Sequence, residues 1–368
     1  MYLNVPTNWD DKIIEKIKEI NHGCRYKYKI KQVYGASLTF FGAGRLDTPE
    51  ISVDIMKNHI SKIKQLGILF NFLINAPSIG GIEHDRRYRE QIIETLSWIN
   101  DLGVDMITVS IPLIGELINH YFPKVGVKIS TILDVRTIQN IDLLERLGPK
   151  IHSVTVSRFV NRDFKLLKEM IHKASYGIEL LANSLCLLNC PYQKYHGDLV
   201  CWFARINKGW EEPFVDYRSL GCDEVRLNNL SEIIKAPWIR PEDLDIYKNL
   251  GVHSIKLGGR TFPTKELIRI IDAYAIGRFD KNLWDLIAPH LPVYVDNSAL
   301  NGFIDFFVKK NIDCNSQCGK CKYCDDIAQK YVALTEDSEK YLHDLCNRLR
   351  ARIDHTQEVR PYFNQSIY

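Results

Sequence analysis

Residues 66–75 read Leu-Gly-Ile-Leu-Phe-Asn-Phe-Leu-Ile-Asn, and this stretch indicates how the whole chain folds. Its Leu-Gly pair is typical of a helix end, because glycine adopts the left-handed conformation that terminates a helix at little cost. The apolar run that follows predicts a buried strand. The same order of helix, glycine and strand recurs at the Leu-Gly pairs 102–103, 147–148 and 250–251. Such repetition predicts βα units and a parallel sheet.

Eight largely apolar segments are candidate strands, and eight strands favour a closed (β/α)8 barrel of the TIM type over an open sheet. No G-x-G-x-x-G motif follows the first of them, which counts against a dinucleotide-binding fold. We predict a barrel domain over residues 1–280, with a Cys-rich insertion at 184–222 after the sixth strand, and a Cys-rich C-terminal extension over 281–368. The candidate strands are Ile30–Ala36, Ile68–Asn75, Met106–Ile111, Val127–Leu133, Ser153–Ser157, Gly177–Ala182, Glu224–Leu227 and His253–Leu257.

The composition is that of a globular protein, since 45% of the 368 residues are hydrophobic and 25% are charged. A formal charge of +3 does not indicate nucleic-acid binding. No apolar run reaches the length of about 18 residues that predicts a membrane span, and the N-terminus lacks the apolar core of a secretory signal. We expect a cytoplasmic protein. Reducing conditions there favour metal ligation or catalysis over disulfides for its ten cysteines.

Cys186, Cys190 and Cys222 lie in the insertion, and Cys186 lies just past the sixth candidate strand. The carboxyl ends of barrel strands form the face on which barrel enzymes build their active sites. Three thiolates there can bind three irons of a [4Fe–4S] cluster, with Cys201, His196 or a substrate atom at the fourth iron. A cluster with an open iron can act as a Lewis acid. The alternative is a set of buried structural thiols, since cysteine is among the most buried residue types.

The extension carries four cysteines within eleven residues, spaced Cys314-x3-Cys318-x2-Cys321-x2-Cys324. This compact spacing favours a second iron–sulfur cluster. A structural zinc site, the alternative, normally joins two cysteine pairs across a longer loop. The first three cysteines also have the spacing of radical S-adenosylmethionine enzymes. Those enzymes place the triad just after the first barrel strand, whereas here it lies beyond the barrel and Cys324 offers a fourth ligand.

Several segments resemble the collagenase-like peptidase family, which includes the anaerobic ubiquinone-hydroxylation proteins and the tRNA and ribosomal RNA hydroxylation proteins. The first is the stretch 183–192 with the later Cys222. The others are Ala-Pro-Trp-Ile-Arg-Pro-Glu-Asp-Leu at 236–244 and Ser-Ile-Lys-Leu-Gly-Gly-Arg at 254–260. The likeness runs in order through the predicted barrel.

This resemblance implies a barrel-like α/β protein with a [4Fe–4S] cluster on four cysteines. It also implies an oxygen-independent hydroxylation, for which prephenate is the apparent hydroxyl source in the better-understood members. The residues do not indicate a peptidase, because we find no Ser/His/Asp arrangement, no H-E-x-x-H motif and no cysteine with a local base. The chain departs from the family in its tighter Cys186–Cys190 spacing, which leaves the fourth ligand open. The extra cysteines of the extension suggest a second cluster and an electron relay.

Four further residues are candidates for contact with substrate. Arg45 lies in a glycine-containing loop after the first candidate strand and Arg260 follows the last one, where a guanidinium suits a carboxylate co-substrate. Lys256 lies within the last apolar strand, so it is expected to point into the barrel, where a cation needs a partner or an anionic ligand. His196, beside the cysteine block, can ligate iron or transfer a proton near neutral pH. A purely structural role is the alternative for Arg45 and for Lys256.

We therefore expect an iron–sulfur oxidoreductase with one or two [4Fe–4S] clusters. It would catalyse an oxygen-independent hydroxylation or related redox modification of a small molecule, a peptide or an RNA base. One alternative is a radical S-adenosylmethionine-type enzyme that uses Cys314, Cys318 and Cys321. Another is a non-catalytic iron–sulfur protein that transfers electrons beside a partner protein.

Overall fold

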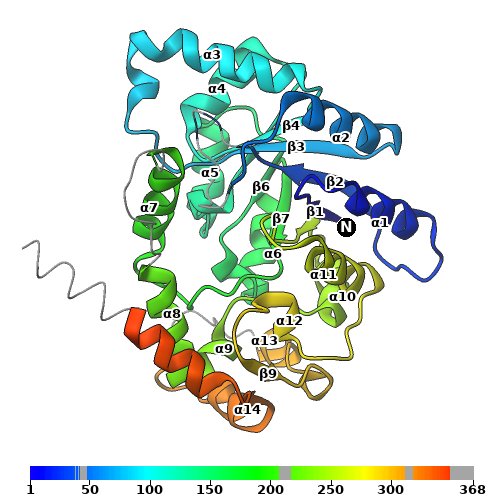
Figure 1. The fold of residues 1–368 in the computed structure, drawn as a ribbon, viewed down its shortest axis with the longest axis vertical. Coiled ribbons are helices and arrows are strands. Elements are labelled where there is room, and N and C mark those ends of the chain that lie inside the picture. Colours follow the sequence, from blue (N-terminus) through cyan, green and yellow to red (C-terminus); the bar gives the residue numbers. More distant parts are fainter. Residues whose placement is uncertain (38, 40, 42–47, 207–216, 311–317, 349–368) are drawn as a thin grey trace, which may run out of the picture.

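Eight parallel strands close into a barrel, with helices around it (Figure 1). The computed structural model describes residues 1–37, 39, 41, 48–206, 217–310 and 318–348. The strands are β1 (Tyr2–Pro6), β2 (Ile30–Gly35), β3 (Leu69–Ile74), β4 (Met106–Val109), β5 (Gly126–Ile129), β6 (Ser153–Thr155), β7 (Gly177–Leu181) and β8 (Ser254–Lys256). Each pairs with its neighbours in chain order, and β8 pairs with β1 to complete the ring. The predicted (β/α)8 fold of the TIM type is confirmed.

Helices surround the barrel and also build the segments that follow it. They are α1 (Asp11–His22), α2 (Val53–Gln65), α3 (Arg86–Asp101), α4 (Pro112–Tyr121), α5 (Ile138–Leu147), α6 (Phe164–Lys173), α7 (Gln193–Ile206), α8 (Tyr217–Asn228), α9 (Ser231–Lys235), α10 (Leu244–Leu250), α11 (Thr264–Ile276), α12 (Trp284–Ile287), α13 (Asp305–Lys310) and α14 (Tyr323–Tyr331). Short 3-10 helices lie at Ile82–His84, Thr131–Leu133, Arg158–Val160, Pro241–Asp243 and Ser298–Leu300. Within the described ranges, no helix combines the length and the apolar character that crossing a membrane requires.

Two strands differ from the expectation from sequence. The sequence pattern does not predict β1, because the polar Asn4 interrupts its apolar run and Pro6 ends it. The predicted strand Glu224–Leu227 was wrong, since these residues belong to α8. An alternation of polar and apolar residues over only four positions fits one helical turn as well as a strand. The Cys-rich insertion therefore follows the seventh strand instead of the sixth, and the loop that contains Arg45 follows the second.

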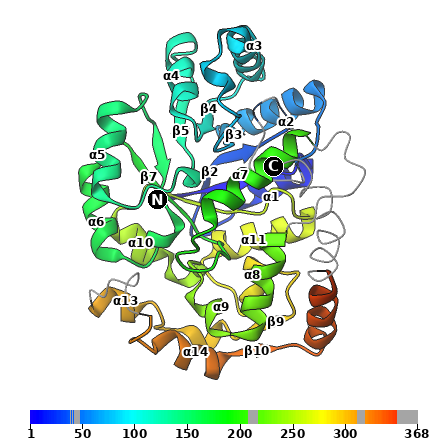
Figure 2. The ribbon, with the colours of Figure 1, turned by 90° about the vertical axis from the view of Figure 1, so that its left-hand side faces the viewer.

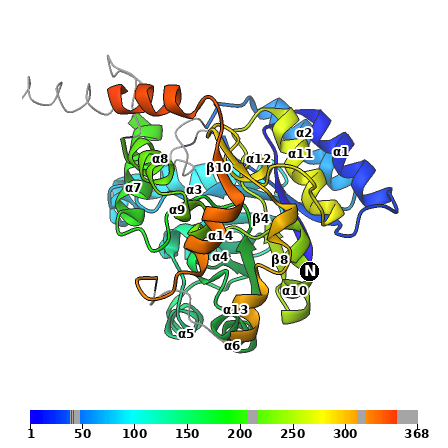
Figure 3. The ribbon, with the colours of Figure 1, turned by 90° about the horizontal axis from the view of Figure 1, so that it is seen from below.

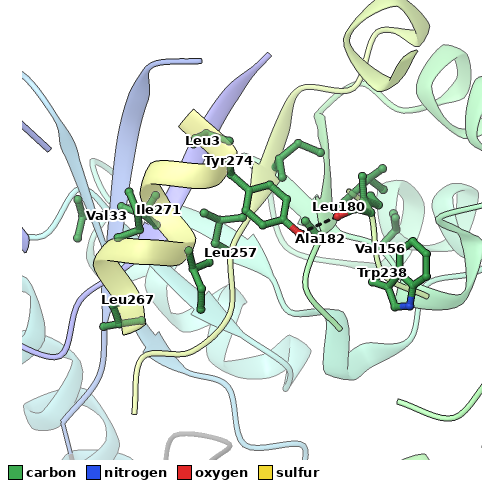
Figure 4. Packing of buried hydrophobic residues seen from close by; sticks show 14 of the residues in the cluster. Leu3, Val33, Val156, Leu180, Ala182, Trp238, Leu257, Leu267, Ile271 and Tyr274 are labelled. Atoms are coloured by element: carbon green, nitrogen blue, oxygen red, sulfur yellow. Dashed lines mark hydrogen bonds between the residues drawn. The ribbon is translucent and has the colours of Figure 1, made fainter. Parts of the chain in front are cut away.

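The outer helices attach to the barrel through apolar stripes, as α11 illustrates. Leu267, Ile271 and Tyr274 recur at intervals of three and four residues and are buried on one side of this helix. Figure 4 shows these side chains packed among apolar residues of the strands. The Tyr274 hydroxyl, although deeply buried, donates a hydrogen bond to the carbonyl of Ile239 at 2.6 Å.

A hydrogen-bonded polar network fills part of the barrel interior, where bulky apolar side chains are usual. Glu179 of β7 is fully buried and accepts hydrogen bonds from Asn4 at 2.9 Å and Thr155 at 2.7 Å. Ser254 donates to it at 2.8 Å, and the Lys128 ammonium lies 3.0 Å away. Burial raises the pKa of Glu179, but the lysine charge and these hydrogen bonds outweigh burial and lower the pKa to about 2. The carboxylate is therefore ionised and fully engaged.

The C-terminal extension packs against the barrel domain and shares its hydrophobic core (Figures 2 and 3). Its two short strands, β9 (Val293–Val295) and β10 (Val332–Leu334), form an antiparallel pair. Helix α14 packs on α9, and Lys235 of α9 forms an ion pair with Asp325 of α14 at 3.0 Å.

The buried Arg162 attaches the extension to the barrel. Its guanidinium donates hydrogen bonds to the carbonyls of Ile234 and Ala236 at 2.7 Å each. The same group lies over the rings of Trp238 and Phe303, at 4.4 and 5.0 Å from their centroids. Phe303 belongs to the extension, so this stacked cation connects the two parts of the chain.

Arg240 makes a second connection and gives the 236–244 segment a structural role. Its Nε donates to Asn297 Oδ1 at 2.8 Å, and one Nη donates to the Asn297 carbonyl at 2.9 Å. Further hydrogen bonds go to the Leu300 carbonyl and to Asn301. The side chain is only 1% exposed, so these acceptors replace water completely.

Candidate functional site

The loops after β7 and β8 meet at the carboxyl end of the barrel. Asn183 donates hydrogen bonds to the carbonyls of Gly258 and Leu286, each at 3.3 Å. In return the backbone N–H of Gly258 donates to Asn183 Oδ1 at 2.5 Å. Gly259 next to it has a φ of +111°, which a side chain rarely adopts, and a Cβ there would lie 2.7 Å from the Phe262 ring. This arrangement fixes the two loops at the face where barrel enzymes work.

Cys186 lies in the loop after β7, beside two arginines. An Nη of Arg158, which follows β6, donates a hydrogen bond to the Cys186 sulfur at 2.6 Å. Burial raises the pKa of the Cys186 thiol, but the positive charges of Arg158 and Arg226 outweigh burial and leave its pKa below the ordinary value. Cys186 therefore loses its proton more readily than an ordinary cysteine does, and the thiolate is the form that binds metals and acts as a nucleophile.

Cys190 and Cys222 lie near Cys186. Burial is the main cause that raises the pKa of Cys222 to about 11, and negative charge on Cys190 and on Cys186 raises it further. Cys186, Cys190 and Cys222 therefore lie in one region of the structure, within range of one another's charge.

The two arginines have hydrogen-bonding capacity left over. Arg226 of α8 donates to the Leu185 carbonyl at 2.5 Å and to Asp223 at 2.7 Å. The Nε atoms of Arg158 and of Arg226 are buried and have no hydrogen-bond acceptor among the residues that the structure describes. Buried donors normally have a partner. Two such donors beside three thiols fit a site that receives additional negative charge.

The thiols fit an iron–sulfur cluster in kind and in neighbourhood, since soft thiolates with nearby cations are what such a cluster requires. Among the described residues, no three His, Cys, Asp or Glu side chains are arranged as a ready metal site. The sulfur atoms of Cys186, Cys190 and Cys222 would therefore have to turn toward one another to bind a cluster. Cys201 is buried on α7, and His196 lies partly buried on the same helix.

The cysteines of the extension are only partly described. Cys314 lies outside the described residues, Cys318 is exposed, and Cys321 and Cys324 are partly buried. Burial raises the pKa of Cys318, and negative charge on Cys321 raises it further, which indicates that these two thiols are neighbours.

The cationic candidates lie around the carboxyl end of β8. Arg260 is partly buried, and its guanidinium lies 3.4 Å from the hydroxyl of Thr48. Lys256 is buried and lies 4.3 Å from the centroid of the Tyr34 ring. Arg45 lies outside the described residues.

Sequence reasoning missed Arg158 and Arg226, which contact the cysteine loop, and the network of Lys128 with Glu179. A signal for the network was present, because both residues are charged positions inside short apolar strands, as Lys256 is. Arg158 follows a strand end, which is the place where barrel enzymes carry functional groups. No feature of the sequence near Arg226 shows that α8 returns to the Cys186 loop.

The chain is similar to known proteins in sequence and in structure. No family model matches the chain. It is 29% identical over 323 residues to an uncharacterized protease of Methanocaldococcus jannaschii, covering 86% of this chain and 92% of that protein. A solved U32 peptidase is similar with a TM-score of 0.48 and 16% identity, over 70% of this chain and 92% of that one. A GH113 β-1,4-mannanase has a TM-score of 0.39 and 11% identity, over 75% of this chain and 98% of that one.

Proposed function

The chain is assigned to the collagenase-like (U32) peptidase family by its motifs and its archaeal homologue, and from that premise we propose that it is an iron–sulfur enzyme. Cys186, Cys190 and Cys222 would bind a [4Fe–4S] cluster, with Cys201 or a substrate atom at the fourth iron. When bound, such a cluster supplies electron transfer or, at an open iron, Lewis-acid chemistry. The proposed reaction is an oxygen-independent hydroxylation or related redox modification of a small molecule, a peptide or an RNA base.

One observation supports this proposal: the Cys186 sulfur, just after β7, accepts a hydrogen bond from Arg158 and lies within range of the charges of Arg226, Cys190 and Cys222. Thiolates that bind a cluster bring negative charge into a partly buried site, where it is costly unless cations lie beside it. Arg158 and Arg226 supply those cations, and their unused Nε donors are available for hydrogen bonds to cluster or ligand atoms. A packing role for the thiols would not require either arginine.

The chain's own residues would divide the remaining work. Arg158 orients the Cys186 sulfur, and Asn183 holds the loop after β7 against the loop after β8. Arg260 is proposed to bind the carboxylate of a co-substrate, because a guanidinium matches that group with two parallel hydrogen bonds. We propose the same role for Arg45, and for His196 a role as ligand or proton carrier.

A second cluster or a structural zinc ion is proposed for Cys314, Cys318, Cys321 and Cys324. A cluster there would relay electrons from a partner protein to the barrel. The neighbouring thiols of Cys318 and Cys321 support a shared metal in either case.

The decisive experiment is anaerobic purification of the full chain, followed by iron and sulfide analysis and Mössbauer spectroscopy. We expect about four iron atoms per chain for one cluster and about eight for two. Cys222→Ser should abolish the first cluster and Cys321→Ala the second. The exposed Cys24 provides the matched control, since Cys24→Ser should leave the iron content unchanged. Stoichiometric zinc without iron, or full iron retention in Cys222→Ser, would contradict the proposal.

A peptidase is the second candidate function, and it runs against the expectation from sequence. The homologue bears the name of a protease, and the lowered pKa of Cys186 is a property of nucleophilic cysteines. Degradation of casein or gelatin by the purified chain, lost in Cys186→Ser, would support it. Iron-dependent activity toward another substrate, with no proteolysis, would exclude it.

A further inference from the structure

Lys256 is a buried cation to which the proposed cluster gives no role. It is the last residue of β8, and its side chain is 8% exposed. Glu179 lies opposite Ser254 in the β7–β8 register, whereas Lys256 lies opposite Leu181. Lys256 therefore sits one inward-facing layer closer to the carboxyl end of the barrel than Glu179, on the side where substrates bind.

The two lysines inside the barrel have different surroundings. Lys128 lies 3.0 Å from Glu179 and donates to Gln32 at 2.6 Å, so its charge is compensated. Among the described residues, no carboxylate lies within ion-pair distance of Lys256. Its ammonium instead lies over the Tyr34 ring, at 4.3 Å from the centroid. An aromatic face stabilises a buried cation less well than a carboxylate does.

We propose that Lys256 is a nucleophilic amine that forms an imine with the carbonyl carbon of a small 2-oxo carboxylate at the carboxyl end of the barrel. The side chain lies at the carboxyl end of β8 and is buried enough to lose much of its hydration. A desolvated lysine near other cations is the usual environment of an imine-forming lysine.

The charges around Lys256 support a neutral amine. Burial is the main cause that lowers its pKa to about 7. Glu179 on β7 raises the pKa, while Lys128 on β5 and Arg260 after β8 lower it. Tyr34 on β2 adds a neutral ring. The unprotonated amine is thus far more populated at neutral pH than in an exposed lysine, whose pKa near 10.4 keeps it almost fully protonated.

The same charges select the ligand. An amine attacks aldehydes and ketones in general, but the positive charge of Arg260 acts on Lys256 from the side of the barrel opening. A carboxylate next to the carbonyl group would pair with that guanidinium and place the carbonyl carbon near the amine. This reasoning does not depend on the cluster.

The reaction balances without an oxidant or reductant. The lone pair of Lys256 Nζ attacks the carbonyl carbon, and the nitrogen loses two protons in all. The carbonyl oxygen takes up both protons and leaves as water, and a C=N bond replaces C=O. Cyanoborohydride, used as a probe, then adds hydride to that carbon while the nitrogen takes a proton, which gives a stable secondary amine.

The test uses the full chain with pyruvate and cyanoborohydride, followed by mass spectrometry and peptide mapping. We expect one reduced pyruvyl adduct, on Lys256, with labelling that rises through about pH 7 as the amine loses its proton. Lys256→Arg keeps the charge but should give no adduct. Labelling spread over exposed lysines with none at Lys256, or labelling of Lys256 only above about pH 9, would overturn the proposal.

A second variant keeps the test sharp if Lys256→Arg fails to fold. Arg260→Gln removes one positive charge, so the pH midpoint for labelling of Lys256 should rise, and pyruvate should lose its advantage over acetone. An unchanged midpoint together with an unchanged preference for pyruvate would count against the proposal. Labelling of Lys256 in Cys222→Ser, measured beside its iron content, separates this result from the fate of the cluster. We expect equal labelling in that variant.

Discussion

Replacing Lys128 by methionine tests the polar network inside the barrel most directly. The variant leaves Glu179 without its buried counter-charge, which costs about 3–5 kcal/mol in buried pairs of this kind. An unfolding entropy of about 2.1 cal/mol/K per residue gives ~0.8 kcal/mol/K for a chain of this length. The melting temperature should therefore fall by about 4–6 °C. Thermal and urea unfolding, followed by circular dichroism at pH 7, measure this change.

The pH dependence of the stability that Lys128→Met loses identifies the cause of that loss. In the wild type the pKa of Glu179 is lowered from 4.5 to about 2, so its contribution to stability is present above pH 4.5 and is lost as the pH falls toward 2. Without Lys128, Glu179 loses the largest of the effects that lower its pKa, so its pKa rises. The folded variant then binds a proton at a higher pH than the folded wild type does. The difference in stability between wild type and variant should therefore shrink as the pH falls.

The double variant Lys128→Met with Glu179→Gln is the matched control. It removes both charges, so no buried ion lacks a partner, and more than half of the lost stability should return. A single variant as stable as the wild type at pH 7 would refute this reasoning, as would a difference that grows as the pH falls.

Three further substitutions test the contact between the two loops of the site, the attachment of the C-terminal extension and the packing beside β2. Asn183→Ala removes hydrogen bonds between the loops after β7 and β8 and should cost about 1–3 kcal/mol, seen as a lower urea midpoint. Arg162→Leu removes the cation stacked on Trp238, so limited proteolysis should release the C-terminal extension faster than in the wild type. Gly35→Ala places a methyl group 2.9 Å from the Trp9 indole, and this overpacking should cost about 1–3 kcal/mol by thermal unfolding.

Each of these predictions has a result that would contradict it. An unchanged urea midpoint for the first variant would mean that the two loops hold each other by other contacts. Wild-type resistance to proteolysis in the second would mean that the shared core alone retains the extension. For the third, substitution of a more open glycine, Gly221, is the control, because a Cβ there meets nothing within 4 Å. Equal effects at both positions would contradict the packing argument.

The fold was predictable where a strand is buried on both faces. Residues 68–75 are almost wholly apolar, and the structure has β3 within them. The strand β1 escapes this rule because Asn4 points inward to bond Glu179, a contact that becomes visible only when the barrel is closed. The segment Glu224–Leu227 shows the opposite error, since its alternation is too short to separate a strand from a helix.

The site was predictable as far as its chemistry is local. The spacing of Cys186 and Cys190, with Cys222 later in the chain, predicts a thiol cluster, and the three lie within range of one another's charge. The arginines that face them could not be predicted, because Arg158 and Arg226 come from different elements and approach Cys186 only through tertiary packing. The spacing of cysteines predicts a shared site by itself, whereas the role of an arginine depends on which residues the fold places beside it.

The ion pair of Lys128 and Glu179 inside the barrel also has a consequence for the register of the strands. Sliding one strand by two positions preserves which side chains point inward, so the inward and outward alternation alone does not distinguish the two registers. Here the slip would move Lys128 about 7 Å along its strand, given roughly 3.3 Å per residue, and would separate its charge from Glu179. The buried ion pair therefore favours one register of the strands and makes the neighbouring registers less stable.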